Sequence, residues 1–256
     1  RAWLVQWAHR KEPPELEMTL TGHVGAVNAV AVTPNGQQVI SVADDGTLRI
    51  WNISTGIAKR VLVGHKGRIY AVALSLDGRQ AISGGEYGVR VWNLDTGQIT
   101  GELAAYKSRV WAVAVLPKGH HIISGGSDRT LRVWNLDTSE PEQVLTGHTN
   151  IIRAVAVTPN GKQLISGGAD GMLHIWDLTT GHMERALYGH VGKVRAVALT
   201  PDGLRAICGG DDMFLRVWNL AAGKRKQMLI GHMRGTNAID VMPDGQRIVS
   251  GGEDGT

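Results

Sequence analysis

Serine, histidine and aspartate recur along this sequence in a fixed order. His23, Ser41 and Asp45 form the first such set, and His148, Ser166 and Asp170 repeat it. These are the side chains of a hydrolase triad, in which histidine takes a proton from serine and aspartate orients the imidazole. A catalytic triad is a single activated constellation, whereas this set is duplicated along the chain. The duplication favours a structural role, because buried hydroxyl, imidazole and carboxylate groups must be hydrogen-bonded.

The duplication belongs to an internal repeat of 41 or 42 residues. Three markers keep one register, namely a tryptophan, a Gly-His pair and a turn such as Thr-Pro-Asn-Gly. The tryptophans are Trp51, Trp92, Trp134, Trp176 and Trp218. Such a period is the signature of a repeat architecture, and it defines six repeats that begin near residues 22, 64, 105, 147, 189 and 231.

Within one period the pattern predicts four short strands. Residues 26–32 are small and β-branched, as expected of a strand that is buried on both faces. A Pro-Asn-Gly turn follows, and residues 38–43, 47–52 and 59–63 give three further strands. Because no segment shows a sustained 3.6-residue apolar period, the sequence predicts almost no helix.

These motifs carry a family resemblance. Gly-His, a strand–turn–strand segment and then Ser-x-x-x-Asp-Gly-Thr-Leu-Arg-Ile-Trp-Asn resemble the WD-repeat family of β-propellers over residues 15–256. The resemblance implies an all-β propeller of four-stranded antiparallel blades that binds other proteins and is not an enzyme. The unusual likeness of the repeats to one another resembles bacterial, including cyanobacterial, multidomain proteins. That likeness implies a scaffold or sensor domain within a larger signalling or regulatory protein.

The same resemblance implies a hydrogen-bonded tetrad of His, Ser, Asp and Trp in each blade. Two repeats keep all four residues and the others each lack one. The members are His23, Ser41, Asp45 and Trp51; His65, Ser83 and Trp92; Ser124, Asp128 and Trp134; His148, Ser166, Asp170 and Trp176; His190, Asp212 and Trp218; and His232, Ser250 and Asp254. Glu86 is the nearest acidic candidate in the second repeat, and Tyr106 replaces the third histidine. Cys208 takes the fifth serine position, where we expect a small buried group and not a nucleophile.

Composition argues against a disulfide-dependent, membrane-spanning or metal-binding protein. The chain has 256 residues, a net charge of +4 and one cysteine, so it can bury a large core without disulfides. The single thiol favours a reducing, cytoplasmic setting. No apolar run approaches the ~20 residues of a membrane span, and no Cys cluster or HExxH motif predicts a metal or other cofactor.

The ends of the chain bear on the number of blades. The first residue, Arg1, indicates a segment of a longer polypeptide. Residues 1–14 form a lead-in, and residues 15–256 form the predicted propeller. Residues 15–20 are predicted to be a fourth strand, and residues 3–7 a third strand, that together complete the last blade. This arrangement favours a closed six-bladed ring over a truncated seven-bladed one.

Positions that differ between such similar repeats are free to encode recognition. The clearest lie where the first strand of each repeat begins, and in the family's geometry they open onto the face where partners dock. They are Arg68, Tyr70, Arg109, Trp111, Arg153, Lys193 and Arg195. Arginine pairs with carboxylate or phosphate and aromatic rings anchor partners, so we predict a basic–aromatic rim for an acidic or phosphorylated peptide or a partner domain.

Three other interpretations remain open. The rim arginines could instead pair with acidic residues of neighbouring turns, such as Asp44, Asp211 and Glu253, although repeats three and four carry Ser127 and Ala169 there. The same basic rim could bind nucleic acid, with an affinity that falls steeply with salt. Catalysis in the central channel would need a convergent pair of acid–base groups outside the tetrads, and the sequence shows none.

Overall fold

The computed structural model of this chain describes residues 18–103 and 108–256. In these two ranges every regular element is a β-strand. The strands are β1 (Val27–Val32), β2 (Gln38–Ala43), β3 (Thr47–Asn52), β4 (Ala58–Val63), β5 (Ile69–Leu74), β6 (Gln80–Gly85), β7 (Gly88–Asn93), β8 (Ile99–Leu103), β9 (Val110–Val115), β10 (His121–Gly126), β11 (Thr130–Asn135), β12 (Glu140–Thr146), β13 (Ile152–Val157), β14 (Gln163–Gly168), β15 (Met172–Asp177), β16 (Met183–Tyr188), β17 (Val194–Leu199), β18 (Arg205–Gly210), β19 (Phe214–Asn219), β20 (Lys224–Ile230), β21 (Thr236–Val241) and β22 (Ile248–Gly252).

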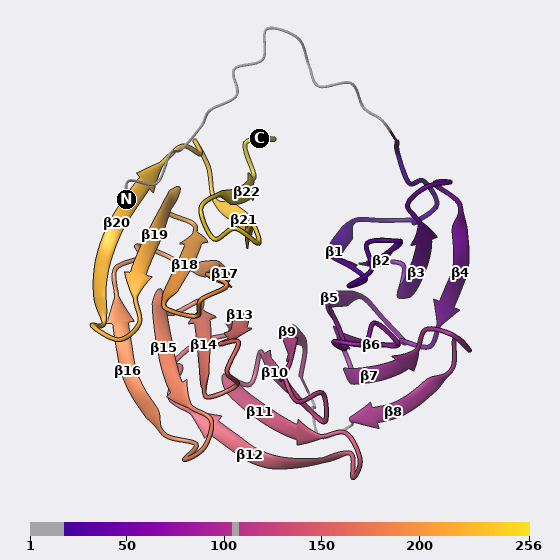
Figure 1. The fold of residues 1–256 in the computed structure, drawn as a ribbon, viewed down its shortest axis with the longest axis horizontal. Coiled ribbons are helices and arrows are strands. Elements are labelled where there is room, and N and C mark those ends of the chain that lie inside the picture. Colours follow the sequence, from indigo (N-terminus) through magenta and orange to yellow (C-terminus); the bar gives the residue numbers. More distant parts are fainter. Residues whose placement is uncertain (1–17, 104–107) are drawn as a thin grey trace, which may run out of the picture.

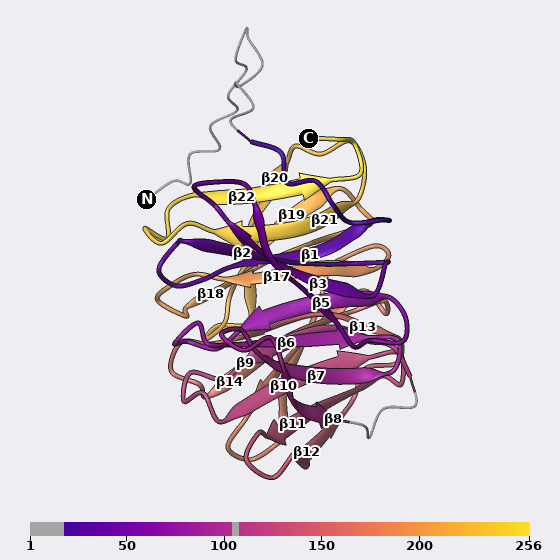
Figure 2. The same cartoon turned by 90° about the vertical axis from the view of Figure 1, so that its right-hand side faces the viewer.

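The strands form six antiparallel sheets that follow one another around an axis (Figure 1). Blades 1 to 5 are the sheets β1–β4, β5–β8, β9–β12, β13–β16 and β17–β20, and blade 6 is β21–β22 within the described ranges. The first strand of every blade is innermost, with β1 and blade 6 at the two ends of the row. In side view the sheets lie in successive layers (Figure 2). The predicted all-β fold of antiparallel blades is confirmed.

The hydrophobic core lies between the blades. The buried tryptophans of blades 2 to 5 pack against the preceding blade, as Trp92 does against Ile40 and Ile50 of blade 1. Trp134 and Trp176 pack in the same way against blades 2 and 3. A four-stranded blade presents apolar side chains on both faces, so it can bury them only between two neighbours. The repeat period of the tryptophans is therefore the period of the core.

Close contact between blades explains the Gly-Gly pairs that end the second strands. A Cβ on Gly84 would lie 2.8 Å from Cγ1 of Val110 in the next blade. At Gly125 a Cβ would meet Ile152 Cγ2 at the same distance. Such distances are too short for a side chain, and therefore glycine lets each inner strand approach the preceding blade.

Every inner strand carries a β-bulge near its start. In blade 1 the register jumps between Val27 and Ala29, which leaves Asn28 unpaired with β2. The same shift occurs in the other five blades. We call the six extra residues the bulge row: Asn28, Tyr70, Trp111, Arg153, Arg195 and Asn237. Since a bulge re-aims the side chain of its extra residue, the fold gives these six positions a common orientation.

The predicted closure of the last blade concerns mainly residues outside the described ranges. Met18 is the first described residue, and its sulfur lies 2.6 Å from where a Cβ on Gly56 of blade 1 would be. Arg60 of β4 has the corresponding place at Gly97 of blade 2. Met18 thus lies against blade 1 as an outer strand lies against the blade that follows it. The choice between six and seven blades stays a prediction.

Candidate functional site

The His, Ser, Asp and Trp side chains of blades 1 and 4 form closed hydrogen-bonded networks. In blade 4, Trp176 Nε1 donates to Ser166 Oγ at 2.8 Å, and Ser166 Oγ lies 2.8 Å from His148 Nε2. His148 Nδ1 lies 2.8 Å from Asp170 Oδ2. Burial raises the pKa of Asp170, but hydrogen bonds from His148 and two backbone N–H groups outweigh it and hold the pKa at about 2.

Blade 1 has the same geometry. His23 lies 2.7 Å from Ser41 and 2.9 Å from Asp45, and Trp51 donates to Ser41 at 2.8 Å. In both blades the serine oxygen already accepts from indole and bonds to imidazole, and Ser166 is fully buried. A buried serine whose hydroxyl is held by both indole and imidazole has no access to a substrate, which supports a structural role.

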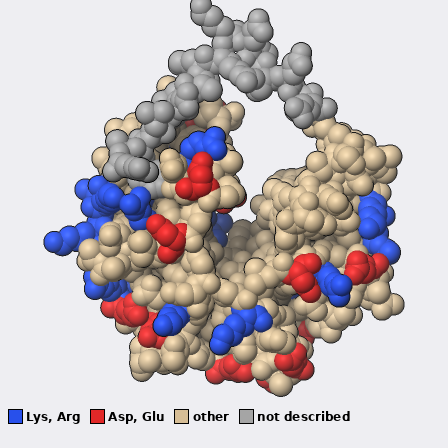
Figure 3. All heavy atoms as spheres, viewed as in Figure 1, with Lys and Arg blue, Asp and Glu red and all other residues tan. Residues whose placement is uncertain are grey.

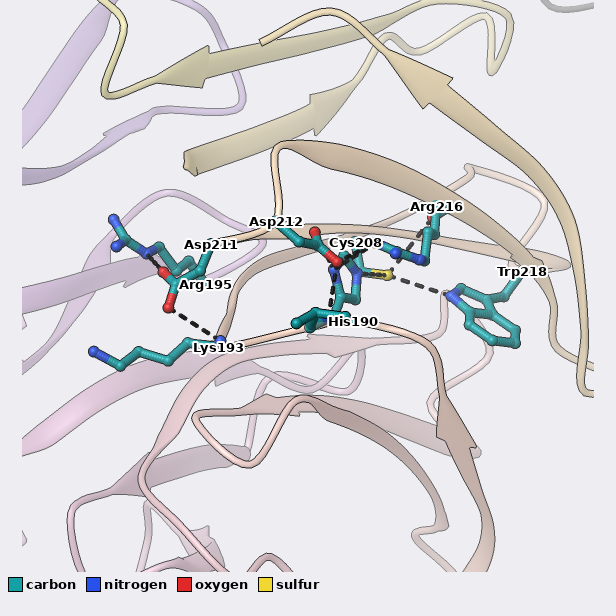
Figure 4. A network of polar contacts seen from close by, with 9 residues as sticks. His190, Lys193, Arg195, Cys208, Asp211, Asp212, Arg216 and Trp218 are labelled. Carbon is teal, nitrogen blue, oxygen red and sulfur yellow. Dashed lines mark hydrogen bonds and ion pairs between the residues drawn. The ribbon is translucent and has the colours of Figure 1, made fainter. Parts of the chain in front are cut away.

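In blade 5 the tetrad contains Cys208 in place of serine (Figure 4). Trp218 Nε1 donates to its Sγ at 3.3 Å, and His190 Nε2 lies 3.0 Å from the same sulfur. The thiol is fully buried, and burial raises its pKa to about 12. Arg216 contacts both His190 and Asp212, each at 2.8 Å, and so extends the network by one cationic residue.

This geometry predicts the behaviour of Cys208 variants. Cys208→Ser places the hydroxyl of the other blades in the same network, so we expect stability equal to or above wild type. Cys208→Ala leaves the Trp218 N–H and the His190 ring without this partner, and it should lower the free energy of unfolding by about 1–3 kcal/mol. Urea unfolding measures both effects. Equal stability of the alanine variant and wild type would show that the sulfur contacts contribute nothing.

In blade 2 the acidic candidate does not enter the tetrad. Glu86 accepts a hydrogen bond from Tyr70 Oη at 3.1 Å and pairs with Arg109 at 3.7 Å. Arg90 Nη1 lies 3.1 Å from His65 Nδ1, where Asp lies in blades 1 and 4. By its backbone hydrogen bond to Arg68, Glu86 has the place that Asp44 has in blade 1, and the one-residue deletion removes the aspartate that follows there. Burial and then the Arg90 charge lower the pKa of His65 to about 3.

Blades 3 and 6 keep part of the network. Trp134 donates to Ser124 at 2.7 Å, and Asp128 pairs with Arg132 at 2.6 Å. Tyr106, the predicted replacement for the third histidine, lies outside the described residues. In blade 6, His232 lies 2.8 Å from Ser250 and 3.1 Å from Asp254.

Sequence reasoning missed a fifth member of these networks. The residue two positions before each tryptophan is Arg49, Arg90, Arg132, His174 or Arg216. Three of these arginines contact the histidine or aspartate of their own blade. Blade 4 has His174 at this position, and its ring stacks on that of His148 with the ring centroids 4.0 Å apart. The signal was present in the sequence, as a cationic position in fixed register with the tryptophan.

Side-chain contacts join neighbouring members of the bulge row in two groups, Tyr70–Trp111–Arg153 and Arg195–Asn237. Tyr70 stacks on Trp111 with ring centroids 4.1 Å apart, and the Arg153 guanidinium lies 4.2 Å from the Trp111 ring centroid. Arg195 Nη1 donates to Asn237 Oδ1 at 2.7 Å. Stacking and cation–π contacts of this kind stabilise a rigid aromatic platform. The structure thus brings four of the seven predicted rim residues into one row.

Acidic residues of the turns pair with the basic residues beside this row. Arg68 lies 3.7 Å from Asp44, and Arg109 lies 3.7 Å from Glu86. Arg195 pairs with Asp211 at 2.5 Å and also with Glu253. Acidic and basic side chains are also interspersed on the face of the molecule that Figure 3 presents. The alternative in which rim arginines pair with neighbouring acids therefore describes these three.

Unlike these three arginines, Arg153 and Lys193 form no ion pair with an acidic residue in the described ranges. Among the described residues, Arg153 Nε is buried and has no hydrogen-bond partner. Burial and the charge of Arg195 lower the pKa of Arg153. The backbone N–H of Lys193 donates to Asp211, and its side chain extends beyond that carboxylate (Figure 4) with no ion pair in the described part of the chain. Arg153 lies in the inner strand of blade 4, and Lys193 directly precedes the inner strand of blade 5. The turn of blade 4 between them carries Ala169 in place of an acidic residue.

The rest of the described surface offers little for other chemistry. Within residues 18–103 and 108–256 no group of three His, Cys, Asp or Glu residues is placed to hold a metal ion. The same ranges contain no helix that is long and apolar enough to cross a membrane. Lys224, Arg225 and Lys226, the densest basic run, lie exposed on the outer strand β20.

The repeats also match a family model, the WD domain with its G-beta repeat. It matches six times, at residues 14–52, 56–93, 97–135, 139–177, 181–219 and 223–256. The chain belongs to the WD-repeat family. Each match contains the inner strands of one blade, and from the second match on it begins with the outer strand of the preceding blade. The sequence repeat is therefore offset from the blade by one strand.

Curated relatives share short stretches of these WD repeats. The pre-mRNA-splicing factor prp46 of Emericella nidulans is 39% identical over 61 residues, which is 22% of this chain and 14% of that protein. The nuclear distribution protein nudF 2 of Penicillium rubens is 51% identical over 37 residues, 14% of this chain and 8% of the relative. The ribosome biogenesis protein ERB1 of Yarrowia lipolytica is 43% identical over 44 residues, which is 17% of this chain and 5% of that protein. The chain thus spans a small part of each of these proteins.

Proposed function

We propose that this chain is a non-catalytic protein-interaction domain that binds an acidic segment of a partner at the bulge row. The observation that carries the proposal is the Tyr70–Trp111–Arg153 stack, which combines a rigid aromatic surface with a cation. Aromatic residues and arginine dominate the binding energy of protein interfaces. The WD-repeat fold and relatives named for splicing and ribosome biogenesis support a scaffold role.

The surroundings of the stack support a docking surface. An open hollow of about 410 Å³ adjoins it between blades 2 and 3, lined by Glu86, Tyr87, Ser108, Arg109 and Ser127. Arg109, which lines this hollow, is more than half exposed. The partner in this proposal is a protein, a peptide or another domain of the same polypeptide, in a larger signalling or regulatory protein of the cytoplasm. The relatives named above are fungal, and the bacterial origin suggested by the regular repeats stays a prediction.

Nucleic acid is the weaker candidate for this surface. Phosphate-backbone binding draws on unpaired lysines and arginines, with an affinity that falls with each counterion released. Three of the rim arginines are already paired with carboxylates of this chain. A short acidic segment needs fewer free cations and can use the aromatic stack as well.

Charge reversal tests the proposal. Arg109→Glu, Arg153→Glu and Arg195→Glu combined should reduce binding of a purified partner by at least about 100-fold, because like charges then meet across the interface. The partner is first identified by photocrosslinking from position 111. The matched control is Lys224→Glu, Arg225→Glu and Lys226→Glu, with the same charge change on the exposed outer strand. Circular dichroism verifies that both variants fold.

Two outcomes would contradict the proposal. Unchanged binding by the folded rim variant would place the interface elsewhere. An equal loss in the β20 control would show that net charge, and not the bulge row, attracts the partner. A salt dependence typical of duplex binding, with RNA captured in place of protein, would favour the nucleic-acid alternative.

A further inference from the structure

A turn residue faces the bulge row from each blade, at the same backbone position. These turn residues are Asp44, Glu86, Ser127, Ala169, Asp211 and Glu253. Each donates its backbone N–H to the carbonyl oxygen two residues before its bulge residue, at 2.7–3.0 Å. Ala169 does so to Ile151 at 2.7 Å. The six positions are therefore structurally equivalent, and only their side chains differ.

In four blades the turn side chain accepts a hydrogen bond from the bulge residue of its own blade. Asn28 donates to Asp44 at 2.8 Å and Tyr70 donates to Glu86 at 3.1 Å. The other two pairs are Trp111 with Ser127 at 2.8 Å and Arg195 with Asp211 at 2.5 Å. The turn side chain is thus the regular acceptor for a polar or cationic bulge residue.

The turn carboxylate also pairs with the next blade. Asp44 pairs with Arg68 and Glu86 pairs with Arg109, both of which precede the inner strand that follows. Lys193 has the corresponding place in blade 5, so its partner by register is residue 169. One carboxylate therefore serves two groups, the bulge residue of its own blade and the cation of the next.

Blade 4 lacks this carboxylate. Ala169 offers no acceptor, and in the described ranges Arg153 Nε is buried without a hydrogen bond while Lys193 has no ion pair. Leaving a buried charged donor unsatisfied is costly, and a group that supplies the missing acceptor gains that free energy on binding. The charge of Asp211 acts on both Arg153 and Lys193, but its carboxylate forms its ion pair with Arg195, which also pairs with Glu253.

We propose that Arg153 and Lys193 receive the side-chain carboxylate of an aspartate or glutamate from the partner, in the position that Ala169 leaves vacant. This inference rests on the proposed function and names the chemistry of its contact. In blades 1 and 2 the same position holds a carboxylate, with a bulge residue and the cation of the next blade around it. A carboxylate can accept two parallel hydrogen bonds from a guanidinium, which suits an arginine placed over the Trp111 ring.

Ala169→Asp tests the inference, because it places the carboxylate of the other blades into this position. The probe is a fluorescent oligoglutamate peptide, with an oligoglutamine peptide and a phosphoserine peptide of equal length beside it. We expect Ala169→Asp and Arg153→Gln each to weaken oligoglutamate binding by about tenfold or more, since each removes the free cation. The matched control, Ala169→Asn, adds similar bulk without charge and should retain most of the affinity.

The nitrogen resonance of Arg153 Nε gives a second readout that does not depend on any partner. Oligoglutamate should shift this resonance in wild type, and Ala169→Asp should shift it without peptide. Unfolding by urea should show that Ala169→Asp is at least as stable as wild type.

The outcomes separate this inference from the proposed function. Peptide binding that Ala169→Asp leaves intact overturns the assignment to this position, while the rim proposal still depends on its own charge-reversal variants. Tighter binding of phosphoserine than of oligoglutamate overturns the carboxylate assignment. Failure of oligoglutamate to shift the Arg153 resonance overturns the inference as a whole, and leaves partner binding by the rim to be decided by the purified partner.

Discussion

Replacing Trp176 with alanine is expected to lower the free energy of unfolding by about 3–5 kcal/mol. The indole is 1% exposed and packs against Ile123, Leu131 and Val133 of the preceding blade. Its removal leaves a cavity between two blades that rigid sheets cannot close. Urea unfolding followed by circular dichroism measures the loss.

Phenylalanine at the same position separates packing from hydrogen bonding. Trp176→Phe keeps most of the buried area but removes the N–H that donates to Ser166. Because Ser166 still bonds to His148, this variant should lose only about 0.5–1.5 kcal/mol. Losses of equal size in the two variants would mean that the hydrogen bond, and not the core between the blades, accounts for the role of Trp176.

Mild acid is expected to destabilise the protein through His174. Burial, and then the charge of the stacked His148, lower the pKa of His174 to about 4, against an effect of Asp170 in the opposite direction. Between pH 6.5 and 4 the unfolded chain therefore binds a proton at this site that the folded chain does not. Stability falls as the pH falls through that window, by on the order of 3 kcal/mol for the whole shift. Above pH 6.5 the contribution is constant.

His174→Arg should remove this pH dependence. Arginine is charged in both states, and the residue at this position in blade 5, Arg216, lies 2.8 Å from Asp212. In blade 4 the new guanidinium should pair with Asp170. Urea unfolding at several pH values between 4 and 7 compares the slopes, and His65 contributes equally to both proteins. An unchanged slope in the variant would show that His174 does not titrate with folding.

The period, the blades and the tetrad residues could be read from the sequence because each is repeated. A pattern present six times identifies its own register, and the resemblance to WD repeats then assigned tetrad roles to residues such as Trp51 and Ser83. Glu86, the nearest acidic candidate for the second tetrad, lies at the position of Asp44 and outside the tetrad. The deletion in the second repeat breaks the register there, so spacing could not distinguish the two positions.

The sequence by itself determined that this chain is a series of WD blades and that positions near the start of each first strand vary. It also marked Arg153 as one of those positions. Only the tertiary structure decided which of them are neutralised, because the partner of each rim cation lies in another turn or another blade. Asp44 pairs with Arg68 across a blade boundary, whereas Ala169 leaves Arg153 without its acceptor in the described structure. Ion pairing depends on distances of a few ångströms between segments far apart in the chain, and those distances exist only once the blades have packed.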